Sequence, residues 1–146
     1  MKLSTRSRYG TRLMIELATR FGKGPIFLKE IAKNQDISEK YLSQLVIPLK
    51  AKGLISSYRG AHGGYILSKP PAEITLKDIV EPLEGDLSLI DCIANSSICG
   101  KASDCVSRDV WERLGDKIIE FLSSITLEEL MRMRRKKIDE VYTYTI

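Results

Sequence analysis

The 146-residue sequence has only one histidine and three cysteines, and it contains no apolar run long enough to cross a bilayer. Its first ten residues, MKLSTRSRYG, lack the apolar core of a secretory signal. We also find no catalytic constellation and no substrate-binding motif. These absences predict a cytoplasmic protein that is not an enzyme and has no membrane partner.

Charge is distributed unevenly along the chain, although 43% of the residues are hydrophobic and can form an ordinary core. Residues 1–70 carry 13 Lys and Arg against 4 Asp and Glu, a charge of +9. Residues 71–146 carry 10 against 15, a charge of −5, which leaves the net charge of +4. Because Lys and Arg displace condensed counterions from a phosphate backbone, the basic half predicts salt-dependent binding to nucleic acid. The acidic half is expected to face away from it.

Residues 37–65 predict the centre of the fold. Ser38 suits a helix N-cap, and the helix that follows has an apolar face made of Leu42, Leu45, Val46 and Leu49. Gly53 suits the C-cap of that helix. Residues 54–58 and 65–67 have the composition of strands, and the glycine-rich sequence RGAHGG joins them. This order predicts a winged helix, in which residues 54–67 form the wing.

A short amphipathic helix over residues 28–33 and a polar turn at residues 34–36 precede Ser38. Together they predict a helix-turn-helix whose second helix, the reader helix, enters the major groove of DNA. Pro48 lies inside the reader helix, where we expect a distortion but not an end.

A first helix is predicted by an apolar stripe that comprises Tyr9, Leu13, Leu17 and Phe21. The pattern stops at Gly22, Gly24 and Pro25. Three arginines lie off the stripe, where they could contact phosphates or be solvated: Arg6, Arg8 and Arg12.

Two groups of residues are candidates for DNA contact. The outward side chains near the start of the reader helix are Ser38, Lys40, Tyr41, Ser43 and Gln44. The tip of the wing supplies Arg59, Gly60 and His62. Gln and Ser can hydrogen-bond base edges, and Arg suits phosphate or a narrow minor groove. Each feature alone is also typical of a solvated helix or an ordinary hairpin, but their combination with the basic charge favours nucleic-acid binding.

The composition changes at Pro70-Pro71, so we expect a winged-helix DNA-binding domain over residues 1–71 and a sensor loop and dimerisation region over residues 72–146. Thr75 and Asp78 predict a capping box that opens a helix ending at Gly85.

A long helix that begins near Val106 carries an apolar seam at alternating spacings of three and four, formed by Trp111, Leu114, Ile118, Phe121 and Ile125. Such a seam could pack on its own domain. Pairing with a second copy is the favoured interpretation, because a homodimer would present two reader helices to a pseudo-palindromic operator in double-stranded DNA.

Another capping box at residues 126–129 predicts a last helix with Leu127, Leu130 and Met131 on its apolar side. The basic residues 132–137 are expected at its end, where they complement the helix dipole. The tail VYTYTI alternates like a strand.

The three cysteines, Cys92, Cys99 and Cys105, all lie in one polar segment, residues 92–105, here called the cysteine loop. Clustered thiols in a cytosolic protein are typical of metal ligation or redox sensing. Three thiolates suit an iron-sulfur cluster, whereas a closed zinc site takes four protein ligands. A thiol or disulfide switch, and zinc or no ligand, remain alternatives.

Several segments are together specific to one family: MKLSTRSRYG, LKEIAKNQDISEKYLSQLVIPLKAKGLI, SYRGAHGGYIL, ITLKDIVEPLEG, the three cysteines and ITLEEL. On these the chain resembles, over nearly its whole length, the IscR, NsrR and CymR family of bacterial winged-helix transcription regulators. The resemblance implies a mainly α fold with a small β-hairpin wing and a long dimerisation helix. It also implies a transcription regulator, expected to be a repressor, that senses iron-sulfur, redox or nitric-oxide status.

In that family the three cysteines bind a [2Fe-2S] or [4Fe-4S] cluster, and the cluster state changes DNA affinity. The cysteines of this chain would then be the ligands of a cluster that is readily lost in air. Arg108 stands where the iron-sulfur-assembly regulator has a histidine ligand, and Arg8 stands where the nitric-oxide sensor has an acidic one. The fourth ligand would therefore be Asp91, Asp104 or an exogenous group.

The first helix, wing and tail are equally similar to the cysteine-metabolism repressor of the same family, which lacks the cysteine loop. This similarity implies an alternative, a repressor without a cluster that is controlled by a thiol switch or by a partner enzyme of metabolism.

Overall fold

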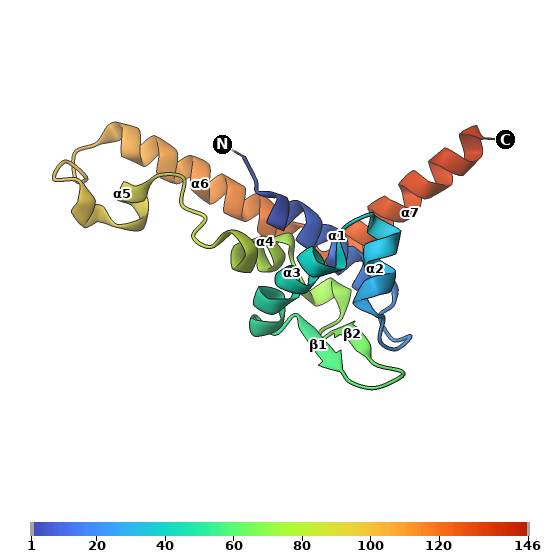
Figure 1. Ribbon diagram of the computed structural model, residues 1–146. Coiled ribbons are helices and arrows are strands. Elements are labelled where there is room, and N and C mark those ends of the chain that lie inside the picture. The colour runs from blue at the N-terminus through green and yellow to red at the C-terminus, as the bar shows by residue number, and fades with distance from the viewer. Residues whose placement is uncertain (1, 146) are drawn as a thin grey trace.

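The computed structural model describes residues 2–145, and it is mainly helical with one two-stranded antiparallel sheet in that range (Figure 1). The predicted fold class is therefore confirmed. None of the described helices is both long and apolar enough to span a membrane. In chain order the elements are α1 Thr5–Thr19, α2 Leu28–Gln35, α3 Glu39–Ala51, β1 Ile55–Tyr58, β2 Gly64–Leu67, η1 Pro71–Glu73, α4 Leu76–Glu84, α5 Asp91–Ala94, η2 Ser96–Ile98, α6 Val106–Ser124 and α7 Leu127–Tyr144.

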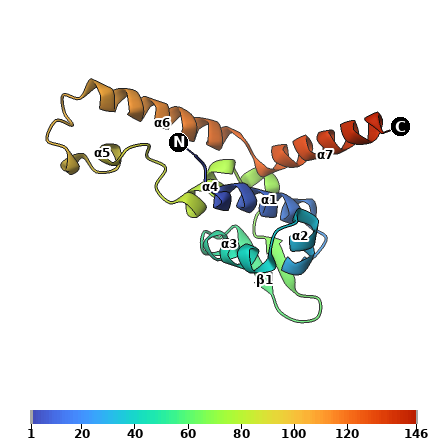
Figure 2. The ribbon, with the colours of Figure 1, turned by 45° about the horizontal axis from the view of Figure 1, so that its top comes forward.

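The first four helices and the hairpin form a body from which α6 and α7 extend in opposite directions (Figures 1 and 2). Their junction is fixed to the body by an antiparallel bridge between Thr75 and Thr126. The Leu76 amide donates to the Ile125 carbonyl at 2.8 Å, and the Leu127 amide donates to the Ile74 carbonyl at 2.8 Å. The cysteine loop lies at the outer end of α6, far from the body (Figure 1).

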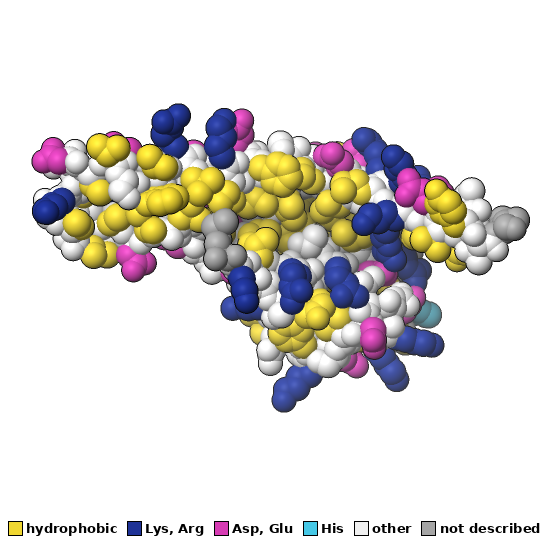
Figure 3. Space-filling model, turned by 90° about the horizontal axis from the view of Figure 1, so that it is seen from above, with side chains coloured by type: hydrophobic (Ala, Val, Ile, Leu, Met, Phe, Trp, Pro, Cys, Tyr) yellow, Lys and Arg dark blue, Asp and Glu magenta, His cyan; other side chains and the backbone are white. Residues whose placement is uncertain are grey.

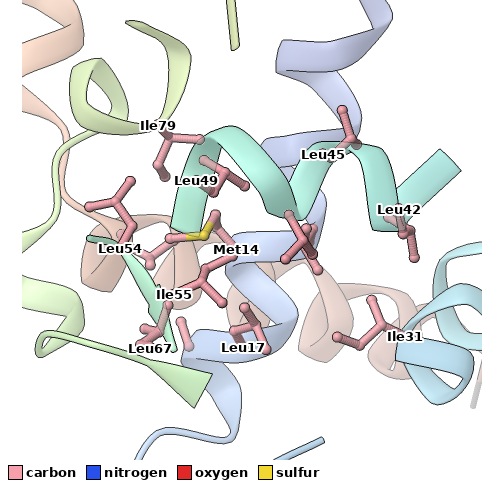
Figure 4. Packing of buried hydrophobic residues seen from close by; sticks show 14 of the residues in the cluster. Met14, Leu17, Ile31, Leu42, Leu45, Leu49, Leu54, Ile55, Leu67 and Ile79 are labelled. Atoms are coloured by element: carbon pink, nitrogen blue, oxygen red, sulfur yellow. The ribbon is translucent and has the colours of Figure 1, made fainter. Parts of the chain in front are cut away.

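A single hydrophobic cluster joins the body to the start of α7 (Figure 4). Leu13 and Leu17 of α1 lie at its centre, and both are at most 1% exposed. The reader helix α3 contributes the four residues predicted for its apolar face. Burial of each such side chain stabilises the fold by about 1.5–3 kcal/mol. From beyond residue 71 the cluster includes Ile74, Ile79, Leu83 and Leu127.

Two local predictions for α3 are confirmed, the Ser38 N-cap and the continuation of the helix past Pro48. The Ser38 hydroxyl accepts from the Tyr41 amide at 3.1 Å, and the helix continues past Pro48 to Ala51. Gly53 follows with a φ of 81°, a left-handed conformation that costs glycine little. The turn between α2 and α3 also contains a left-handed residue, Asp36.

The wing is anchored to the body on one side. β1 pairs with β2 so that Ile55 lies opposite Leu67 and Tyr58 opposite Gly64. Ile26 and Tyr65 exchange two backbone hydrogen bonds, at 2.9 and 3.1 Å. Gly64 has a φ of 129°, and a Cβ there would collide with the Ile26 carbonyl, so only glycine allows this close approach. The hairpin therefore extends from a fixed base.

Three helix boundaries differ from the predictions. The second helix ends at Gln35 and not at residue 33, so Asn34 and Gln35 are helical and only Asp36 of the predicted turn lies outside the helix. The first helix ends at Thr19, so Phe21 lies beyond it and is 43% exposed instead of completing the buried stripe. The last helix does not end at the basic run, which lies in its middle, but continues to Tyr144. Leu127 is buried as predicted.

The strand predicted for the tail is wrong over residues 141–145, and residue 146 lies outside the described range. Thr143 and Thr145 donate their hydroxyls to the carbonyls of Asp139 and Val141, four residues earlier, at 2.8 and 2.7 Å. Alternation stabilises a strand only beside another strand, and the sheet of residues 2–145 is confined to the wing. The helix therefore continues through the alternating sequence.

Both predicted N-caps of the second half form. Thr75 and Asp78 make the complete, reciprocal capping box of α4. Thr126 accepts from the Glu129 amide at 3.2 Å, which supplies the Thr126 side of the box predicted for α7.

The start of α1 is capped by a side chain from the end of α4. Ser4 is the N-cap of α1 but does not cap it with its own side chain. Glu84 Oε1 instead accepts from the Ser4 amide at 2.9 Å, the Ser4 hydroxyl at 2.6 Å and the Ser7 hydroxyl at 2.5 Å. The bonds from the side chains of Ser4 and Ser7 lower the pKa of Glu84 from its ordinary value of 4.5.

Glu84→Gln is expected to lower the free energy of unfolding by about 1 kcal/mol at neutral pH, because a charged acceptor of three hydrogen bonds is lost. The folded-state pKa of Glu84 lies below its unfolded-state pKa. Its contribution is therefore complete above the unfolded-state pKa and is lost as pH falls through the folded-state pKa. Thermal unfolding between pH 3 and 7 should show the two proteins converging at acid pH. Glu81→Gln, one turn earlier in α4, is the control, and the same pH dependence in both variants would contradict this role.

Candidate nucleic-acid interface

The outward face of α3 presents the predicted contacts to solvent. Lys40, Ser43 and Gln44 are all exposed. The Ser43 hydroxyl donates to the Lys40 carbonyl at 2.6 Å, and its oxygen lone pairs are still available to accept. Ser38 is exposed, but its hydroxyl is used to cap the helix. Lys40 and Gln44 therefore have the greatest freedom to reach a base or a phosphate.

Tyr41 is held differently from these neighbours. Its half-buried ring packs edge-to-face on Tyr9, with a centroid distance of 5.9 Å, and its hydroxyl lies 3.0 Å from Thr5 Oγ1. This side chain attaches the beginning of α3 to α1, so its contact with DNA remains a prediction that competes with a packing role.

Ile47 shares the outward face of α3 and is absent from the candidates predicted from the sequence. It is 68% exposed and lies one turn beyond Ser43. An exposed aliphatic group among polar readers suits the methyl group of thymine. The spacing of three and four residues from Gln44 and Ser43 could have identified it, but its apolar side chain also resembles a core residue.

The wing tip exposes Arg59, Gly60 and His62 as predicted. Gly60 has a φ of 107°, and the Gly63 amide donates to its carbonyl at 3.0 Å, which closes a tight turn. Lys50 Nζ donates to the Ser57 hydroxyl at 2.6 Å, so α3 and the wing are also joined by side chains.

An open groove lies between α2, the start of α3 and the wing. Three lysines line it, Lys29, Lys33 and Lys40, together with the aromatic side chains of Phe27 and Tyr65. Figure 3 shows Lys and Arg side chains projecting from the body, which lies below α6 and α7 in that view. Lys29 and Lys33 were not among the sequence candidates, although their position in the first helix of the helix-turn-helix is a usable signal. The groove can accept a phosphate backbone beside the reader helix.

The three arginines of the first helix have different roles. Arg12 donates to Gln35 through Nε and Nη2, at 2.8 and 2.5 Å, and lies 5.3 Å from the centre of the Tyr9 ring. It therefore fixes the end of α2. Arg8 lies 5.7 Å from the same ring, and Arg6 and Arg8 are exposed where phosphate contact remains predicted.

The cysteine loop brings two of its cysteines to one arginine. Cys105 is the N-cap of α6, and its Sγ accepts from the Arg108 amide at 3.4 Å. Arg108 Nε donates to the Cys92 carbonyl at 3.2 Å. Cys92 and Cys105 are half-buried and Cys99 is exposed. The donor atoms suit an iron-sulfur cluster, but residues 2–145 contain no group of three Cys, His, Asp or Glu side chains close enough to hold a metal.

Residues 3–133 match the Rrf2 family, described as "Iron-dependent Transcriptional regulator". This chain belongs to the Rrf2 family. It is 45% identical over 130 residues to the HTH-type transcriptional regulator CymR of Bacillus subtilis, covering 89% of both chains. The family resemblance inferred from the sequence is therefore confirmed, and so is the broad function of a transcription regulator.

Two solved structures have the same fold. The structure of CymR, the global cysteine regulator of B. subtilis, matches with a TM-score of 0.76 and 44% identity, over 91% of this chain and 98% of that one. IscR of T. potens matches with a TM-score of 0.74 and 40% identity, over 92% and 88%. The chain thus resembles both a CymR and an IscR protein over most of its length.

Gln44→Ala and Arg59→Ala are expected to weaken DNA binding in different ways. The probe is the duplex that the unaltered protein enriches from a randomised library, compared with a shuffled duplex. Gln44→Ala should reduce only the affinity for the enriched duplex, by about 1–3 kcal/mol, because a base contact is lost. Arg59→Ala should reduce the affinity for both duplexes. It should also lower the magnitude of the salt slope, the slope of log affinity against log salt concentration, by about 1.

Lys117→Ala is the control for the lost charge, since Lys117 lies on α6 and pairs with Glu120. Fluorescence anisotropy over a range of salt concentrations measures all three variants. An equal loss of affinity for both duplexes in Gln44→Ala would show that Gln44 does not contact base edges.

Proposed function

We propose that this protein is a homodimeric repressor that binds a pseudo-palindromic operator in the cytoplasm through α3 and the wing. The observation that carries the proposal is the exposed polar face of α3 beside a basic groove and a basic wing tip. The reader helix would contact base edges through Gln44, Ser43 and Ile47, while Arg59 and the groove lysines would contact the backbone. Membership of the Rrf2 family supports this role.

Dimerisation through α6 is supported by its uncovered apolar face. Trp111, Leu114 and Phe121 are 43%, 42% and 61% exposed, whereas Leu122 is turned toward the body and buried. Figure 3 shows hydrophobic side chains along the length of α6. Such a stripe is unfavourable in water, and pairing with the same stripe of a second copy would bury it around a two-fold axis. The two reader helices would then be presented to two half-sites.

Leu114→Asp is expected to dissociate the dimer, because two buried carboxylates would face each other across the axis. Sedimentation equilibrium should show the monomer mass, and affinity for the enriched duplex should fall more than tenfold as the second half-site is lost. Lys117→Asp places the same charge at a side chain that is 77% exposed and should remain dimeric. A dimeric Leu114→Asp protein would show that α6 is not the interface.

For the signal, we propose that Cys92, Cys99 and Cys105 bind an iron-sulfur cluster, [2Fe-2S] or [4Fe-4S]. The family description as iron-dependent and the similarity to IscR support this choice. Such a cluster would respond to oxidants, nitric oxide and iron supply, through a change in its charge or through its loss from the site. Cys105 caps α6 and Arg108 joins that cap to the Cys92 segment, so any change at these thiols acts on the first turn of α6.

A second candidate function is a cysteine-responsive repressor without a cluster, controlled by a thiol switch or by a partner enzyme of metabolism. Two observations favour it: the 45% identity to CymR, and the lack of a ready three-ligand group in the described residues. In this case the thiols would respond by oxidation, or the signal would arrive through another protein.

The first experiment is the measurement of iron and acid-labile sulfide, with the visible spectrum, on protein purified without oxygen. The cluster proposal predicts stoichiometric iron and sulfide with thiolate-to-iron absorption, and Cys99→Ser should abolish all three. Ser103→Ala, a conservative change in the same loop, is the control and should keep them. Protein that stays free of iron after attempted reconstitution would refute the cluster and favour the CymR-like alternative.

A further inference from the structure

Glu16 lies in the last turn of α1 as a carboxylate that is only 4% exposed. It receives hydrogen bonds from two elements on either side of α1. Gln35 Nε2 donates to Oε1 at 2.5 Å, and Asn34 Nδ2 donates to Oε2 at 3.4 Å. Arg134 Nη2 of α7 donates to Oε1 at 2.8 Å, across 118 residues of sequence. A buried carboxylate is stable only with such partners, so this network is a requirement of its burial.

One end of the network fixes the turn of the helix-turn-helix. Asn34 and Gln35 are at the end of α2, and Gln35 is also held by Arg12. The next residue, Asp36, has a φ of 53°, and the Ile37 amide then closes the turn on the Ala32 carbonyl at 3.0 Å. Because the cap of α3 follows directly, the position of Gln35 sets where the reader helix begins.

The other end of the network belongs to α7. Arg134 is the countercharge of Glu16, and its Nη1 is buried without a hydrogen-bond acceptor among residues 2–145. Burial of an unpaired N–H is unfavourable. The side chain as a whole is 36% exposed, so only part of the guanidinium is withdrawn from water. Its neighbour Arg135 points to solvent and carries the same charge.

We propose that Glu16 and Arg134 are positioning residues for operator recognition, through which α7 holds the turn between α2 and α3. Neither side chain needs to touch DNA. The network makes the register of the reader helix depend on the second half of the chain, where the cysteine loop and the exposed face of α6 lie. This inference rests on the proposed DNA-binding function.

The test compares Arg134→Ala with Arg135→Ala on the enriched and the shuffled duplex, at a temperature where both variants are folded. Arg134→Ala should lose at least tenfold in affinity for the enriched duplex. On the shuffled duplex it should lose no more than Arg135→Ala, because both variants lack one positive charge. Arg134→Lys should recover part of the loss, and Glu16→Gln combined with Arg134→Ala should be no worse than the worse single variant.

Amide hydrogen exchange gives a second readout that does not depend on DNA. Residues 34–37 should exchange faster in Arg134→Ala but not in Arg135→Ala. Unchanged exchange and unchanged discrimination between the duplexes would overturn the proposal. An equal loss on both duplexes with a lower salt slope would also overturn it, by making Arg134 a phosphate contact. If the unaltered protein enriches no sequence, the proposed function itself fails, and this inference fails with it.

Discussion

Packing of α1 against five other elements is the constraint on which the rest of the structure depends. Leu13, Met14, Leu17 and Ala18 are at most 1% exposed, and α1 contacts α2, α3, α4, α7 and β2. A helix surrounded in this way leaves no room for polar groups without partners. Glu16 is therefore paired with Arg134, and the polar groups of Ser4 and Ser7 at the start of α1 donate to Glu84. Gly10 lets α4 approach so closely that a Cβ would overlap Leu83. Residues from both sides of Pro70-Pro71 thus share one hydrophobic core.

The features that could be predicted from the sequence are those with local causes. The Ser38 cap, the tight turn at Gly60 and the Thr75 capping box each depend on residues within about a turn of one another, and each appears where predicted. The tail was mistaken for a strand because alternation is meaningful only when a neighbouring strand exists. The Glu16–Arg134 pair has no local signal at all, since its members are 118 positions apart in the sequence.

The candidate site divides in the same way. Polar residues such as Lys40 and Gln44 could be assigned to the outward face of α3 from helical spacing alone. Tyr41 and Ile47 could not, because an aromatic or aliphatic side chain can lie in the core or in solvent, and packing on α1 decides which. The cysteines could be recognised as donors by their type and clustering. The contact between the Arg108 side chain and the Cys92 carbonyl spans 16 positions of loop, and no spacing rule predicts it.

The fixed junction at Ile125 and Thr126 gives α6 the mechanics of a lever. Two backbone hydrogen bonds hold this point on the body, and 19 helical residues extend from it, a length of about 28 Å at 1.5 Å per residue. A tilt of about 10° at the junction would therefore move the outer end by about 5 Å. A tilt of a given angle is therefore a large movement at the cysteine loop and a small one where α6 meets the body.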